Sequence, residues 1–152
     1  MKSFFKNDLL PEGFKVLLPA EAHKEETVSR IILDFFFNNG YELVKTAIIE
    51  YEDNTSKNTL KYLNNNSFML MEPETKKVLV LRSDITPQVA KLASTKLKHY
   101  CRPIRLAYSG EVIRNTKNSY QTDRQFKQIG AEVLGGAANT SLIEILSITI
   151  DI

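Results

Sequence analysis

The stretch RQFKQIGAEVLG (residues 124–135) decides the fold, because side chains alternate between two faces along an extended strand. One face is predicted to be a core face, with Lys127, Ile129, Ala131 and Val133. The other face is predicted to carry Phe126, Gln128, Gly130, Glu132 and Leu134. On this second face the Gln128 carboxamide and the Glu132 carboxylate are separated by one residue of the same face, Gly130. Because the glycine between them has no side chain, we expect room there for a small ligand with a cationic group.

Neighbouring segments predict further strands that join this one in a sheet. PIRLAYSGEV (residues 103–112) also alternates, with Ile104, Leu106, Tyr108 and Val112 on one side. SFMLME and VLVLR (residues 67–72 and 78–82) flank the turn PETKK and predict a hairpin. YELVKTAIIEY (residues 41–51) predicts one or two strands, whereas residues 53–66 and 115–123 are polar and predict loops.

Three helices are predicted between these strands. The first begins at Pro19 or Ala20 and ends at Asn39-Gly40, because proline suits the first helical turn and glycine a left-handed stop. The second follows capping residues at 83–86 and has Pro87 in its first turn. The third begins near Thr140. It stays apolar to residue 152, so we expect residues 1–152 to be the N-terminal part of a single domain, cut within this helix.

Together these elements predict an α+β fold, with an antiparallel sheet and helices packed on one face. The other face is expected to be a polar ligand cradle that carries Arg105, Ser109, Glu111, Gln128 and Glu132.

The composition excludes several classes of protein. A net charge of +2 with scattered basic residues argues against nucleic-acid binding. A single cysteine excludes an internal disulfide, and no apolar run approaches the ~20 residues of a membrane span. We therefore expect a cytoplasmic protein. His23 and His99 have no partners at metal-ligand spacing, so no metal and no cofactor are predicted.

Three motifs resemble the catalytic core of the class II aminoacyl-tRNA synthetases, specifically the histidyl branch. They are YELVKTAIIEYED (41–53), LRSDITPQVA (81–90) and YSGEVIRN with RQFKQIGAEVLG (108–115 and 124–135). The form LRSDITPQVA followed by RPIRLAYSGEV is closer still to the regulatory subunits of ATP phosphoribosyltransferase, a synthetase-like family of histidine biosynthesis. The resemblance covers about residues 9–145. It implies part of the class II synthetase core fold and a homodimer formed through residues 41–51.

The resemblance also implies a histidine site. Asp84, Thr86, Gln128 and Glu132 match positions that hold the α-amino group and backbone of histidine in the synthetases. The chemistry agrees, because carboxylates attract an ammonium group while an amide and a hydroxyl orient it. Two structural alternatives stay open: Gln128 and Glu132 as solvated residues of an exposed sheet face, and Asp84 and Thr86 as helix caps.

The nucleotide site is expected to be lost. In the histidyl synthetases an arginine of the second motif grips the α-phosphate of ATP, and Ser109 is interpreted as standing at its position. A hydroxyl cannot supply that doubly donating cation, so no catalytic residue is predicted. Glu111, Arg114 and Arg124 are then either vestigial nucleotide contacts or residues that serve only the fold.

Three functions follow from the resemblance. The first is a non-catalytic regulatory subunit of ATP phosphoribosyltransferase, in the first step of histidine biosynthesis. It would be required for activity of the short catalytic subunit, its partner, and for feedback control by histidine. The second is a histidyl-tRNA synthetase fragment that forms histidyl-adenylate and charges tRNA. The third is a stand-alone amino-acid sensor. Ser109 favours the first.

Overall fold

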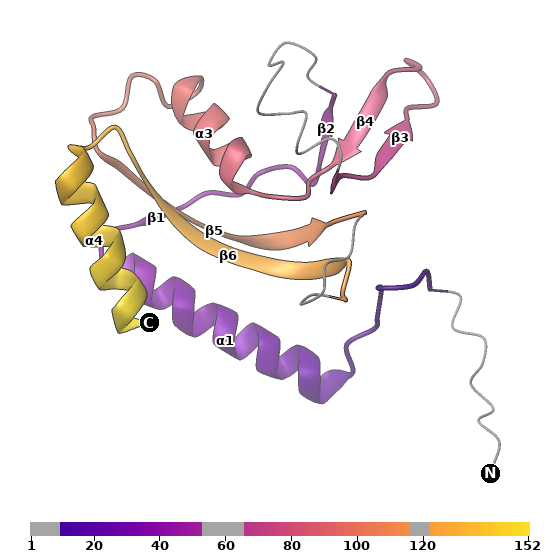
Figure 1. Ribbon diagram of the computed structural model, residues 1–152, viewed down its shortest axis with the longest axis horizontal. Helices are drawn as coiled ribbons and strands as arrows, with labels where there is room; N and C mark the ends of the chain where they lie inside the picture. Colours follow the sequence, from indigo (N-terminus) through magenta and orange to yellow (C-terminus); the bar gives the residue numbers. More distant parts are fainter. Residues whose placement is uncertain (1–9, 53–65, 116–121) are drawn as a thin grey trace.

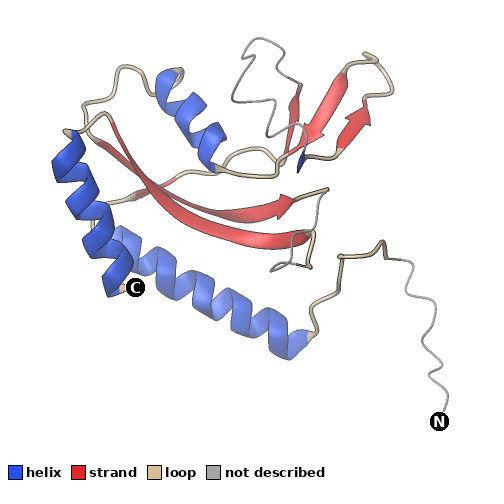
Figure 2. Ribbon diagram, in the orientation of Figure 1, coloured by secondary structure: helices blue, strands red, loops and turns tan. Residues whose placement is uncertain are grey.

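The computed structural model of the protein describes residues 10–52, 66–115 and 122–152, so the predicted loops at 53–66 and 115–123 lie largely outside the described residues. Figures 1 and 2 show the three described helices around two sheets. In chain order the elements are α1 (Pro19–Asn38), β1 (Glu42–Leu43), β2 (Ile49–Tyr51), β3 (Met69–Met71), β4 (Val78–Leu81), α3 (Thr86–Ser94), β5 (Ile104–Ile113), β6 (Gln125–Leu134) and α4 (Ala138–Asp151). The predicted helices and strands are confirmed.

The strands form two three-stranded sheets, ordered β1-β5-β6 and β2-β4-β3. Strands β5 and β6 pair antiparallel along their whole length, from Ile104 opposite Leu134 to Ile113 opposite Gln125. They make the long curved ribbon at the centre of Figure 1. Among the described strands, the short β1 alone runs parallel to its neighbour, β5. The predicted α+β class, with an antiparallel sheet flanked by helices, is confirmed.

Helices cover both faces of the β5–β6 ribbon, so the prediction of helices on one face only is wrong. Helix α3 packs on one face, over a buried cluster of Ile85, Val89, Ile104, Leu106, Tyr108 and Val112. Helices α1 and α4 pack on the opposite face, in a second cluster of Phe36, Tyr41, Ala107 and Ile148. Figure 1 shows α3 on one side of the ribbon and α1 on the other.

The register between the two strands explains this difference. Tyr108 lies opposite Gly130, and Ser109 lies opposite Ile129. The face of Gln128 and Glu132 is therefore the face of Tyr108. Arg105, Ser109 and Glu111 belong to the other face, so the single polar cradle predicted from the sequence is wrong.

Helix α1 begins and ends where the sequence indicates. Pro19 occupies its first turn, and the Glu21 carboxylate accepts a hydrogen bond from the Leu18 amide at 3.4 Å. Gly40, with φ of +81°, turns the chain away at its end. Within the described parts of the chain, no helix has both the length and the apolar character to cross a bilayer.

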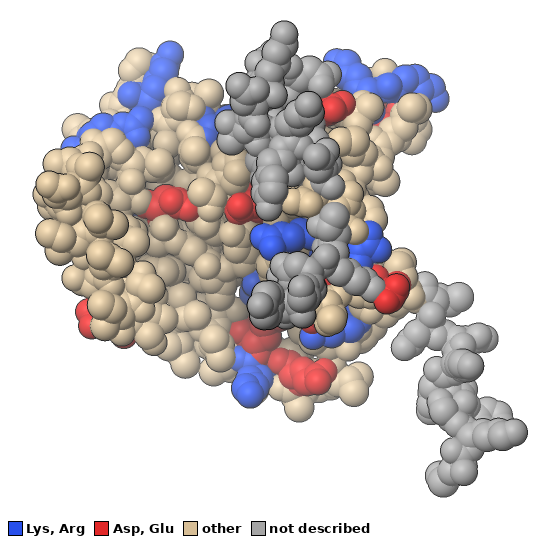
Figure 3. Space-filling view, in the orientation of Figure 1, with Lys and Arg blue, Asp and Glu red and all other residues tan. Residues whose placement is uncertain are grey.

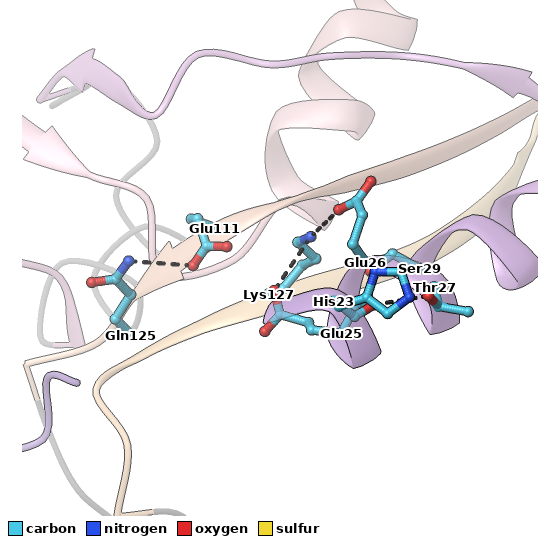
Figure 4. A network of polar contacts seen from close by, with 8 residues as sticks. All are labelled: His23, Glu25, Glu26, Thr27, Ser29, Glu111, Gln125 and Lys127. Carbon is cyan, nitrogen blue, oxygen red and sulfur yellow. Dashed lines mark hydrogen bonds and ion pairs between the residues drawn. The ribbon is translucent and has the colours of Figure 1, made fainter. Parts of the chain in front are cut away.

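Two sets of ion pairs fix α1 and α4 to the sheet. In α4, Glu144 accepts hydrogen bonds from both Arg105 Nε and Nη2, at 2.7 and 2.8 Å, and a third from the Tyr41 hydroxyl at 2.9 Å. In α1, Glu25 and Glu26 pair with Lys127 of β6 at 3.3 and 3.0 Å, as Figure 4 shows. Burial lowers the pKa of Lys127, but hydrogen bonds to these carboxylates outweigh it and raise the pKa overall.

Candidate functional site

The start of α3 and the middle of β6 bring the predicted site residues together. The Gln128 side chain donates from Nε2 to Asp84 Oδ1 at 2.9 Å, and its Oε1 accepts from the Ile85 amide at 2.9 Å. Asp84 Oδ1 also accepts from the Thr86 amide at 3.1 Å, which satisfies one amide of the first helical turn. Asp84 therefore accepts from the first amide of α3, whose N-cap position is Ile85, and faces Gln128 at the same time.

Tyr108 connects the other two predicted residues. Its hydroxyl lies 2.9 Å from Thr86 Oγ1 and donates to Glu132 Oε1 at 3.3 Å. The phenol passes over Gly130, where an added Cβ would lie 2.5 Å from the hydroxyl oxygen. The expectation of free space above Gly130 is therefore wrong, because the ring of Tyr108 occupies it.

Sequence reasoning placed Tyr108 on the apolar side of its strand and missed its polar role. Its side chain is indeed 4% exposed, and burial raises the pKa of its hydroxyl to about 12. The phenol consequently stays protonated and able to donate at neutral pH. No signal in the sequence indicated this role, because the pairing that places Tyr108 opposite Gly130 follows from the register of the two strands.

The resulting acidic cluster, defined as Asp84, Thr86, Tyr108, Gln128 and Glu132, combines two carboxylates with hydroxyl and amide groups. Apart from buried Tyr108, its residues are half-buried, so ligand atoms can reach them. Figure 3 shows several small, separate acidic groups on the face that it draws, in a mainly uncharged surface. Such a set of acceptors can bind an ammonium group through charge-assisted hydrogen bonds.

Arg114 supplies a cation on the same strand face. Its guanidinium carbon lies 4.9 Å from the centre of the Phe126 ring, and Phe126 shares its face with Gln128. Arg114 Nε donates to the Ser83 carbonyl at 3.1 Å, next to Asp84 in the chain. Of the residues considered as vestigial nucleotide contacts, this is the one that the structure places beside the acidic cluster.

Arg124 and Glu111 lie elsewhere. Arg124 donates to the carbonyls of Arg114 and Asn115 at 3.2 and 2.9 Å, and its guanidinium lies over the rings of Phe14 and Phe68. These contacts join the arm before α1 to the end of β5. Glu111 is on the opposite face of the ribbon, where Gln125 donates to it at 3.4 Å (Figure 4).

Ser109 is also on the opposite face, and this overturns the interpretation placed on it. Its neighbours in the ribbon, Ala107 and Ile129, pack in the cluster beneath α1 and α4. A side chain at position 109 therefore points away from Gln128 and Glu132, whatever its chemistry. The absence of an arginine there says nothing about a nucleotide on the site face, where Arg114 lies.

Arg82 and Gln88 hold the segment that carries Asp84 to the connection between β1 and β2. Arg82 donates from Nε to the Glu111 carbonyl at 2.6 Å and from Nη1 to the Thr46 carbonyl and hydroxyl, each at 3.0 Å. Gln88 donates to the Ala47 carbonyl at 2.9 Å and accepts from the Thr46 hydroxyl at 2.6 Å. The connection between β1 and β2 is thus bound to the segment that carries Asp84.

In residues 10–52, 66–115 and 122–152, no group of three His, Cys, Asp or Glu side chains is placed to bind a metal ion. His23 and His99 are exposed.

Comparisons with known proteins agree with this architecture. The sequence profile of the family described as histidyl-tRNA synthetase matches residues 13–152. The ATP phosphoribosyltransferase regulatory subunit of Rhodospirillum rubrum is 36% identical over 143 residues, which cover 94% of this chain and 37% of that protein. The chain thus spans little more than a third of the length of that curated relative.

Solved structures show the same fold. A protein from Bacillus halodurans, titled an ATP phosphoribosyltransferase regulatory subunit/histidyl-tRNA synthetase, superposes with a TM-score of 0.79 at 25% identity, over 99% of this chain and 38% of that one. The apo histidyl-tRNA synthetase of S. aureus gives a TM-score of 0.73 at 20% identity, over 93% of this chain and 33% of that one. The predicted resemblance to the class II synthetase core is confirmed.

Proposed function

This chain belongs to the histidyl-tRNA synthetase family, and we propose that it acts as part of a regulatory subunit of ATP phosphoribosyltransferase rather than as a synthetase. The observation that carries the proposal is an acidic cluster suited to an amino acid, in a chain whose relative at 36% identity is named a regulatory subunit. On this reading the protein has no chemistry of its own. It works in the cytoplasm, in the first step of histidine biosynthesis.

Histidine is the proposed ligand. Asp84 and Glu132 provide negative charge for its ammonium group, while Gln128 and Thr86 provide directional hydrogen bonds. Arg114 lies on the same strand face and supplies the positive charge that an α-carboxylate requires. A zwitterion matches this arrangement, with acidic groups near its amine and a guanidinium near its carboxylate.

The proposed partners are the short catalytic subunit and a second copy of this chain. Strands β1 and β2 are edges of their sheets, and Leu43, Ile48 and Tyr51 in this region are 44%, 42% and 50% exposed. An exposed apolar edge is a surface that a second chain can cover. Light scattering at micromolar concentration should give the mass of a homodimer, and a monomer would contradict this part of the proposal.

Reconstitution tests the regulatory function. Adding the protein to the short catalytic subunit should raise phosphoribosyltransferase activity, and added histidine should lower it again. No complex and no change in rate would reject the proposal.

The synthetase alternative is kept because Arg114 places a cation on the site face, where a phosphate could bind. Histidine-dependent exchange of pyrophosphate into ATP separates the two functions. The regulatory proposal predicts no exchange above the rate without protein, whereas strong exchange would establish the alternative.

A further inference from the structure

We propose that Tyr108 is a positioning residue, which orients Thr86 as an acceptor for the ligand's ammonium group and holds Glu132 in place. This inference rests on the proposed binding of an amino acid at the acidic cluster. It assigns to a core tyrosine a part in ligand selection.

The direction of the hydrogen bonds carries the proposal. A phenol has one hydrogen, and here it is donated to Glu132 Oε1. The contact of 2.9 Å between the hydroxyls of Tyr108 and Thr86 must then be a donation from Thr86 to Tyr108. With its hydrogen committed to Tyr108, Thr86 can offer the ligand only lone pairs. An ammonium group is a pure donor, so the relay from Thr86 through Tyr108 to Glu132 suits it.

The relay also joins two separate elements. Thr86 opens α3 and Glu132 lies on β6, and Tyr108 reaches both from the neighbouring strand β5. On the same face Leu106 and Val112 fill the core without a hydroxyl, so burial alone does not require one. Gly130 is what admits the phenol, because a methyl group there would collide with its hydroxyl.

The experiment compares Tyr108→Phe with Tyr41→Phe. Tyr41 is a matched control, because it is also buried and also donates to a carboxylate, Glu144, but on the opposite face of the ribbon. Isothermal titration calorimetry of the full chain would use two probes, L-histidine and imidazole-4-propionate, which lacks the amine. Denaturant unfolding would measure the stability of each variant.

We expect the unmodified protein to bind L-histidine more tightly than imidazole-4-propionate. Tyr108→Phe should weaken L-histidine binding about tenfold or more and leave the other probe within about twofold, since only the ammonium group uses the relay. Tyr41→Phe should lose similar stability and keep both affinities. An equal loss for both probes in Tyr108→Phe, or no loss for either, would overturn the inference.

The other outcomes are also decisive. If the unmodified protein does not bind L-histidine, the proposed ligand is wrong and the inference falls with it. If Tyr108→Phe does not fold, Gly130→Ala replaces it, since this variant keeps every polar group and only displaces the phenol. The same selective loss of L-histidine binding is expected, and unchanged selectivity would overturn the inference.

Discussion

Gln128 Nε2 lies 2.9 Å from Asp84 Oδ1, so a carboxamide on β6 holds a carboxylate at the start of α3 across 44 residues of sequence. The other end of the same carboxamide accepts the Ile85 amide. Gln128 is thereby fixed in one orientation, with its amide nitrogen toward Asp84. The acidic cluster is consequently organised before any ligand arrives, which reduces the entropy lost on binding.

The charge of Asp84 is predicted to matter more than its shape. Asp84→Asn keeps an oxygen that can accept from Thr86 and Gln128 but removes the negative charge. L-histidine affinity should fall about tenfold or more, because a charge-assisted hydrogen bond becomes a neutral one. Asp34→Asn is the control, since it makes the same charge change at an exposed position of α1. Calorimetric titration would contradict the prediction if both variants bound like the unmodified protein.

Position 109 is predicted to affect stability and not ligand binding. Ser109→Arg places a guanidinium among the residues beneath α1 and α4, and should lower the free energy of unfolding by about 2 kcal/mol. Ser109→Ala should change neither stability nor affinity appreciably. Chemical denaturation and titration with L-histidine or ATP would measure both effects. A gain of ATP binding in Ser109→Arg would show that position 109 faces the site after all.

The attachment of α4 is predicted to depend on pH. Hydrogen bonds from Arg105 lower the pKa of Glu144 below its ordinary value of 4.5. A carboxyl group whose pKa is lowered by folding stabilises the folded protein at pH values above its ordinary pKa. This stabilisation is lost as the pH falls through the folded-state pKa. Glu144→Gln should therefore cost about 1 kcal/mol near pH 7, a figure that allows for solvent screening, and progressively less below pH 4.5. Unfolding curves that differ equally at pH 7 and pH 3 would contradict this.

Arg82 is predicted to need its guanidinium and not only its charge. Arg82→Lys retains a cation but cannot reach the carbonyls of Glu111 and Thr46 together, so stability should fall by about 2 kcal/mol. Arg30→Lys, at an exposed position of α1, is the matched control and should leave the stability nearly unchanged. The measurement is the midpoint of denaturant unfolding, and equal midpoints in the two variants would refute the role assigned to Arg82.

The sequence predicted each strand's alternation correctly but not how the strands pair. The two faces of 124–135 are confirmed, as is the shared side of Ile104, Leu106, Tyr108 and Val112. The relation between them depends on the register in which β5 and β6 pair, which neither strand's own pattern determines. A shift of one residue exchanges the faces, and this is how Ser109 was assigned to the wrong side.

The other members of the acidic cluster were predicted from a resemblance, but Tyr108 was not, and the reason is physical. Asp84, Thr86, Gln128 and Glu132 are polar and stand out, whereas Tyr108 fits an apolar stripe. A tyrosine can satisfy both roles, with its ring in the core and its hydroxyl at the site. Which role applies depends on neighbours that only the folded chain provides, here Gly130 and Thr86.

Histidine inhibition of the reconstituted transferase tests the central claim most directly, with the unmodified protein and Asp84→Asn compared in the same assay. Both proteins should activate the short catalytic subunit to similar rates. Histidine should inhibit the complex with the unmodified protein. Half-maximal inhibition of the complex with Asp84→Asn should require a histidine concentration about tenfold higher or more. Coincident curves, or an absence of activation by either protein, would contradict the claim that this acidic cluster senses histidine for a catalytic partner.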